Sequence, residues 1–232
     1  MGTRRAAAEG TDWAARAKSA CGVLAAPLFV TVFTAIGARR AGYDWRRHAV
    51  SSLGVGREGW AQRANFMVVG ALYCVAADGL AQRPAEAVAP AVVPAIVLAV
   101  GVGLIGSGVF VTDPVGGFPP SKQTPDGVSP PAAPTRAGKL HNLCAIPIFA
   151  GIPAAALTCA ASAARRREYR WAAYCAGSAI GITGTFVLFA AAFGGAPRLA
   201  GHGGVLQRLS VATGFGWVSA LSLRALRASR RA

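Results

Sequence analysis

Apolar residues recur along the chain in six long runs, separated by shorter polar stretches. A helix that crosses the roughly 30 Å hydrocarbon core of a bilayer needs about 20 apolar residues. Six runs meet this length, approximately residues 19–38, 60–80, 88–111, 140–163, 171–193 and 205–225. Transmembrane β-strands would alternate apolar and polar residues, whereas these runs are continuous. The pattern predicts an all-α integral membrane protein with six transmembrane helices in one bundle.

The six runs define one transmembrane domain, residues 19–225, between two basic tails. Residues 1–18 hold three arginines and a lysine, and residues 226–232 hold three arginines. We expect both tails to be disordered and to lie near anionic lipid headgroups. The first run has the length of a full span and is followed by arginines instead of a small-residue cleavage site, so we interpret it as retained.

Composition supports the membrane assignment and narrows the class of protein. Hydrophobic residues make up 53% of the 232 residues and charged residues 14%, which excludes a water-soluble domain and a disordered chain. The net charge of +15 would suggest nucleic-acid binding in a polar sequence, but a membrane explains it better. Slightly more than half of the basic residues fall on the face that holds the termini. We therefore predict a multi-pass cell-membrane protein with cytoplasmic termini and no nucleic-acid partner.

The second, fourth and sixth runs begin alike, with a glycine followed three residues later by two polar residues. The three pairs of polar residues are Gln62-Arg63, His141-Asn142 and Gln207-Arg208. The similarity suggests three tandem helical hairpins, each presenting polar groups at the same depth. If the hairpins are real, these polar groups surround one vestibule at the membrane face opposite the termini. The candidate substrate-binding residues are Arg47, Arg63, Asn65, Asn142 and Arg208.

Candidate catalytic residues gather on the face opposite the termini. All three histidines of the chain fall there, together with two aspartates beside span ends. Asp44, His48 and Ser52 are spaced by four, so they would line one face of a short helix over residues 43–53. Ionisable groups at membrane depth are costly and tend to mark function. The candidate set is Asp44, His48, Ser52, Asp113, His141 and His202.

Two chemistries suit this set. Three imidazoles and a carboxylate could bind zinc and activate a water. Alternatively, aspartate and histidine could act as a general acid and base in a water-poor pocket. No H-x-x-x-H or H-E-x-x-H spacing is present, so we favour acid/base chemistry without a cofactor and assign no metal ligands.

The loop over residues 112–139 holds seven of the 14 prolines. We expect it to be neither helical nor buried, and to adopt extended conformations. Its two possible roles are a lid over the vestibule and a plain connector.

Several strings of residues carry a family resemblance. Tyr43-Asp44 to His48, Ser51-Ser52-Leu53-Gly54, Gly59-Trp60-Ala61-Gln62, Gly106 to Pro114 and Gly138 to Asn142 resemble a family of bacterial and archaeal six-helix membrane proteins catalogued as domain of unknown function 998. The resemblance covers about residues 20–225 and implies the six-helix fold without an activity. The residue types are also similar to those of the membrane hydrolases that include alkaline ceramidases, although His202 lacks the second histidine of their late helix.

Three functions remain open. The first is an enzyme acting on a lipid or isoprenoid-like substrate, such as a cyclase, isomerase or hydrolase, with membrane lipids and a hydrophobic small molecule as partners. The second is a transporter of a small solute or of protons, although ionisable residues are scarce near the span centres. The third is a non-catalytic scaffold or sensor whose histidines respond to pH.

Overall fold

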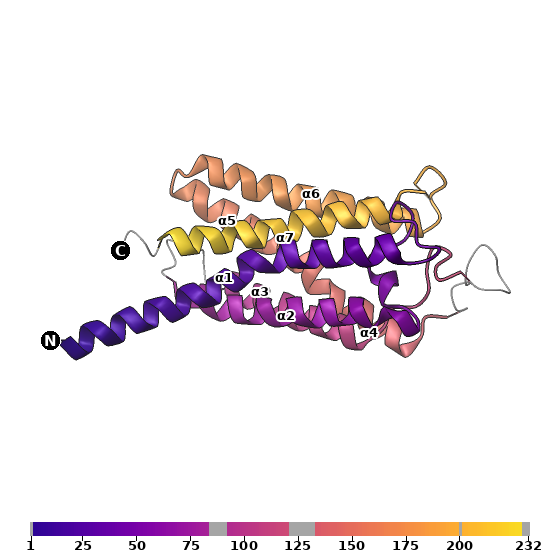
Figure 1. The fold of residues 1–232 in the computed structure, drawn as a ribbon. Coiled ribbons are helices and arrows are strands. Elements are labelled where there is room, and N and C mark those ends of the chain that lie inside the picture. Colours follow the sequence, from indigo (N-terminus) through magenta and orange to yellow (C-terminus); the bar gives the residue numbers. More distant parts are fainter. Residues whose placement is uncertain (1, 84–91, 121–132, 200, 229–232) are drawn as a thin grey trace.

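A computed structural model describes residues 2–83, 92–120, 133–199 and 201–228 (Figure 1). Over these residues the fold is helical, without a strand longer than an isolated bridge, and six helical segments are long and apolar enough to cross a membrane. The helices are α1 (Gly2–Arg39), α2 (Trp60–Ala81), α3 (Val92–Val109), α4 (Arg136–Ile146), α5 (Ile152–Arg165), α6 (Tyr169–Phe193) and α7 (Gly203–Ala228). The chain is thus a six-helix membrane bundle, as the apolar runs predict.

The helices pack as a ring that follows the order of the chain. Each spanning segment contacts the next one, and α7 returns to pack along α1. The two spans of each predicted hairpin therefore contact each other, but neighbouring spans of successive hairpins are packed together as well. Both termini lie at one end of the bundle, and the segments that follow α1, α3 and α6 lie at the other (Figure 1). We call the latter the loop end.

The fourth spanning segment is made of three parts. α4 continues into a π-helical turn, η3 (Pro147–Gly151), and then into α5. Pro147 and Pro153 lack the N–H that a regular α-helix would use at these positions, which explains why the turn widens there. Single π-helical turns of this kind are frequent at functional sites.

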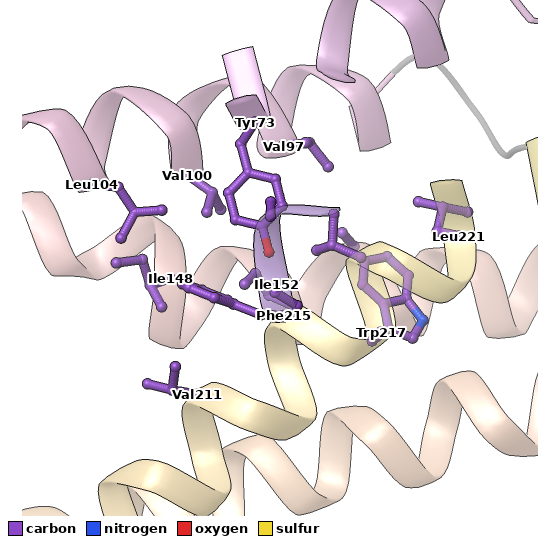
Figure 2. Packing of buried hydrophobic residues seen from close by; sticks show 14 of the residues in the cluster. Tyr73, Val97, Val100, Leu104, Ile148, Ile152, Val211, Phe215, Trp217 and Leu221 are labelled. Atoms are coloured by element: carbon purple, nitrogen blue, oxygen red, sulfur yellow. The ribbon is translucent and has the colours of Figure 1, made fainter. Parts of the chain in front are cut away.

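The interior of the bundle is filled by aromatic and branched side chains. Tyr73 of α2 and Phe215 and Trp217 of α7 are fully buried, and Figure 2 shows them among branched side chains of the core. The indole N–H of Trp217 donates to the sulfur of Cys175 at 3.3 Å. All five cysteines lie in the described residues, and no disulfide joins any two of them.

Two segments differ from the expectations for the tails and the proline-rich loop. Residues 2–18, expected as a disordered tail, continue α1 as a helix, and their many alanines favour that conformation. In the loop, the expectation of an exposed, non-helical segment was wrong at two places. Phe118 is fully buried, and a helix begins at Arg136 with Thr135 as its N-cap. Residues 121–132 of the loop and the tail residues 229–232 lie outside the described residues.

Candidate functional site

A cavity of about 480 Å³ opens at the loop end, between the fourth segment and α6. Its aromatic lining residues, which we call the aromatic wall, come from η3 and α6. Phe149 of η3 stacks on Phe186 of α6 at 4.3 Å between ring centroids, and Phe189 and Phe193 of α6 line the cavity as well. The π-helical turn contributes directly, because Phe149 and Ala150 belong to it. A cavity of this size is in the range of small-molecule sites.

The polar lining residues, which we call the polar wall, belong to other elements than the aromatic ones. They come from the loop before α2, the end of α3, α4 and α7, and they are Ser51, Thr112, Asp113, His141, Asn142 and Gln207. In the described part of the chain, no arginine or lysine lines the cavity, and Asp113 is its one charged residue. The cavity lining therefore combines aromatic side chains with uncharged polar side chains and one carboxylate.

Asp113 fixes the start of α4. Its carboxylate accepts hydrogen bonds from the backbone N–H of Thr135 at 3.0 Å and from the Thr135 hydroxyl at 2.5 Å. The Thr135 hydroxyl oxygen in turn accepts from the N–H of Gly138 at 3.0 Å and caps the helix. A β-carbon on Gly138 would lie 2.1 Å from an oxygen of Asp113. The end of α3 and the start of α4 are thus joined through one carboxylate.

His141 lies one helical turn after this junction and is 6% exposed. Its Nδ1 is 2.8 Å from the carbonyl oxygen of Phe110, near the end of α3. Because a carbonyl only accepts, Nδ1 must carry the proton, and in the neutral ring Nε2 keeps a lone pair. His141 therefore has a fixed tautomer that presents a base, in a wall of the cavity.

Gln207 approaches the same cavity from α7. Its Oε1 accepts the backbone N–H of Val50 at 2.6 Å, which ties α7 to the loop before α2. In the described part of the chain no acceptor bonds its Nε2 amide, so two N–H donors remain. Ser51 and Asn142 add a hydroxyl and a second amide to this side of the cavity.

The repeated start of the even-numbered spans has a structural basis. Each glycine of the repeat lies where a β-carbon does not fit: 2.1 Å from Gly54 O for Gly59, 2.1 Å from Asp113 for Gly138, and 2.5 Å from the carbonyl of His48 for Gly204. The first polar residue of each pair is buried, and these residues are Gln62, His141 and Gln207. The second residue of each pair is more exposed. The buried residues of the repeat thus face the interior, and two of them reach the cavity.

His48 is buried beside the cavity but has a different role. Its Nδ1 accepts the backbone N–H of Asp44 at 2.9 Å, and its ring lies 5.2 Å from that of Phe118. Burial is the main cause that lowers the pKa of His48, and the nearby guanidinium of Arg47 lowers it further. The Asp44 carboxylate opposes this shift. His48 therefore holds the loop as a neutral ring and does not line the cavity.

Arg208 binds the protein's own backbone. Its guanidinium donates to the carbonyls of Trp45 at 2.7 Å and His48 at 3.1 Å, and to the hydroxyl of Tyr43 at 2.6 Å. Burial is the main cause that raises the pKa of Tyr43, so its hydroxyl stays protonated. These contacts fasten the loop after α1 onto α7.

A comparison with protein families finds a match for this chain. The family described as "Protein of unknown function (DUF998)" matches residues 23–224, which includes four of the six spans whole and most of the first and last. The chain belongs to the DUF998 family. No curated protein and no solved structure matches it. The resemblance carried by the sequence motifs is therefore confirmed, and the family brings the chain no activity.

Of the residues predicted for the site of this DUF998 protein, the structure brings only some together. Asp113, His141 and Asn142 line the cavity. Asp44, Arg47 and His202 are exposed away from it. The remaining candidates, Ser52, Arg63, Asn65 and Arg208, are not in its walls either.

The predicted short helix over residues 43–53 is not continuous in the structure. Residues 45–47 form a turn, in which the N–H of His48 reaches the carbonyl of Asp44 at 2.8 Å, and a 3₁₀ helix, η1, follows over Ser51–Gly54. Ser52 is fully buried in it. The spacing of four therefore does not place Asp44, His48 and Ser52 along one face toward the cavity.

Gln207, Ser51, Thr112 and the aromatic wall were absent from the predicted set. The repeat at the span starts includes both Gln207 and its charged neighbour Arg208, and the residue that is buried and lines the cavity is Gln207. Within the described residues, no three His, Cys, Asp or Glu side chains gather as metal ligands. The residues that could contact a bound molecule are those of the two walls.

Proposed function

We propose that this DUF998 protein is a membrane enzyme that binds an amphipathic, lipid-like substrate in the cavity and acts on its polar end by acid/base chemistry. The observation that carries the proposal is that one cavity is lined by aromatic side chains from η3 and α6 and by polar side chains, His141 among them, from other elements. The apolar chain of the substrate would lie against Phe149, Phe186 and Phe189. Its polar end would meet His141, Asn142 and Gln207.

His141 is the general base in this proposal. Its Nδ1–H is held by the carbonyl of Phe110, so Nε2 is the atom that takes a proton from the reacting group. The arrangement resembles the way other enzymes use a hydrogen bond on one ring nitrogen to fix the role of the other. Asp113 supports this geometry, because it fixes the first turn of α4 one turn before His141.

The charge of the walls favours one class of polar end. A phosphate or diphosphate would need cationic partners in a site that excludes water. The described walls offer the Asp113 carboxylate and neutral amides instead. The proposed substrate therefore has an uncharged or cationic polar end. Arg47 and Arg63, which the sequence predicts as substrate-binding residues, do not line the cavity.

Turnover of natural lipids tests the proposal. The purified protein would be incubated with a polar lipid extract from the membranes of the producing cells, and the lipids that disappear and appear would be identified by mass spectrometry. His141→Ala should lower turnover by about 10²–10⁴-fold, the usual worth of a general base. Leu143→Ala is the matched control, because Leu143 lies on the same helix, is 59% exposed and does not line the cavity. Equal turnover by the wild type and His141→Ala would refute the role of His141.

We place the protein in the cell membrane with its termini in the cytoplasm, so the cavity would open toward the outer face. The greater number of basic residues at the terminal end supports this orientation. Labelling of single cysteines, placed at Arg198 and at Arg167 in a cysteine-free variant, with a membrane-impermeant maleimide on intact cells checks it. Labelling of the cysteine at position 167 and not of the one at position 198 would show the opposite orientation.

A further inference from the structure

A small inner chamber lies directly beneath the cavity. Its volume is about 30 Å³, and its apolar boundary includes Phe29, Phe66, Leu104, Ile148 and Phe215. Leu104, Ile148 and Phe215 approach one another from three different segments of the bundle (Figure 2). Five residues line both the chamber and the cavity and so stand at the border between them: Ser51, His141, Ala145, Phe149 and Gln207.

The chamber is polar at this border. Ser107 of α3 lines it and is 3% exposed, and its hydroxyl oxygen has no hydrogen-bond partner in the described part of the chain. His141 and Gln207 line the same chamber, and their other polar atoms are already bonded: Nδ1 of His141 to the carbonyl of Phe110, and Oε1 of Gln207 to the N–H of Val50. The Nε2 atoms of the two side chains are the ones left to contact a bound molecule. A buried hydroxyl without a partner is costly, which points to a further molecule at this place.

One water molecule fits these conditions. It needs roughly 10–15 Å³ of accessible space and two to four polar partners. The chamber has the volume, and Ser107, His141 and Gln207 supply an acceptor or donor each. The aromatic boundary leaves no room for a larger polar molecule.

We propose that the inner chamber holds a water molecule bound to Ser107, Gln207 and Nε2 of His141, and that this water is the nucleophile of an acyl hydrolysis. The inference rests on the proposed function and specifies its reaction. The substrate is then the ester or amide of a long-chain acid. Neutral N–H donors, such as those of Gln207 and Asn142, suit the oxygen of a carbonyl that becomes negative.

The reaction is a balanced addition and elimination. The water oxygen forms a bond to the carbonyl carbon while its proton passes to Nε2 of His141. The tetrahedral intermediate then collapses, the bond from carbon to the leaving oxygen or nitrogen breaks, and His141 returns the proton to the leaving group. The products are a carboxylic acid and an alcohol or amine, and no oxidant or metal takes part in these steps.

Water labelling tests the nucleophile. The protein would hydrolyse p-nitrophenyl dodecanoate, and in parallel the polar lipid extract, in water enriched in ¹⁸O. We expect one ¹⁸O in the released acid, a rate that falls by 10²-fold or more in His141→Ala, and no acyl group on the protein after acid quenching. Lipid turnover without ¹⁸O in an acid, or an acyl group trapped on a serine, would overturn the proposed nucleophile and leave the lipid enzyme standing.

Ser107 separates a positioning role from a structural one. Ser107→Ala removes one hydrogen bond to the water and should lower kcat about tenfold with little change in KM, whereas a damaged cavity would raise KM. A density map that resolves water should show a peak beside Ser107 and His141 in the wild type and none in Ser107→Val, whose added methyl groups fill the space. An empty chamber in the wild type overturns the proposal even if the protein turns over no lipid.

Discussion

Gly204→Ala is expected to destabilise the protein through a single added methyl group. The new β-carbon would lie 2.5 Å from the carbonyl oxygens of both Trp45 and His48 and 3.0 Å from the carbonyl carbon of Arg46. All three neighbours are backbone atoms, and the N–H of Gly204 is bonded to the carbonyl of Arg47 at 3.1 Å, so the loop cannot move away without losing that bond. Overpacking of this kind costs about 1–3 kcal/mol.

Gly216→Ala is the matched control on the same helix. A β-carbon at Gly216 would meet nothing within 4 Å, so the substitution adds only helix propensity and should stabilise by up to about 1 kcal/mol. Both variants replace a glycine of α7 by alanine, but they are predicted to change the stability of the protein in opposite directions.

Thermal unfolding in detergent measures the difference, with a thiol-reactive dye that reports exposure of the buried Cys159 and Cys175. At roughly 2–4 °C per kcal/mol for a chain of this size, Gly204→Ala should lower Tm by about 2–12 °C. Gly216→Ala should leave Tm unchanged or raise it. A Gly204→Ala protein that melts at or above the wild-type temperature would refute the close packing of the loop on α7, and with it the structural basis of the repeat.

Three further predictions concern the loops and the site. Phe118→Ala should lower the free energy of unfolding by about 3–5 kcal/mol, because the ring is fully buried and its centroid lies 5.2 Å from the ring centroids of both Tyr43 and His48. Phe118→Leu should retain most of the stability. Equal Tm values for the wild type and Phe118→Ala would contradict the burial of this ring. Acid should destabilise the protein through His48, because folding lowers the pKa of this side chain. Its contribution to stability is complete above the unfolded pKa of about 6.5 and is lost as the pH falls from there toward the lower folded pKa. The drop in Tm between pH 8 and pH 5 should be smaller in His48→Gln, and an identical drop would show that His48 does not carry it. Treatment with EDTA followed by gel filtration should leave lipid turnover unchanged, because no three metal-binding side chains gather in the described part of the chain; loss of turnover that zinc restores would refute the acid/base mechanism.

The bundle follows from the sequence because each span is long and apolar enough to be recognised by itself. The ends of the spans depend on local signals that are weaker. Thr135 caps α4 through its contact with Asp113, a partner that lies 22 residues earlier in the chain. The start of that helix at Arg136 therefore could not be read from the apolar pattern, which begins at Leu140.

The candidate site was predicted only in part, for a related reason. The position of the polar pairs at the span starts was recognised, but their orientation depends on which side of each helix faces the ring of neighbours. Gln207 is turned inward and Arg208 is turned toward the loop backbone, where it binds carbonyls of residues more than 150 positions away. Likewise, His48 is held by Phe118 of a loop that is distant in sequence. Contacts of this kind produce no periodic pattern in the local sequence, so they could not be predicted from it.

Occupancy of the cavity tests the central claim most directly. Ala145 lines both the cavity and the inner chamber, so Ala145→Trp would fill the space between the two walls. Ala154→Trp is the control, since Ala154 is exposed on the same spanning segment and lies outside the walls. Lipids retained by each protein after purification in the same detergent would be identified by native mass spectrometry. We predict an amphipathic ligand on the wild type and on Ala154→Trp that is missing from Ala145→Trp. The same ligand at the same occupancy on Ala145→Trp would contradict the claim that the cavity is the binding site.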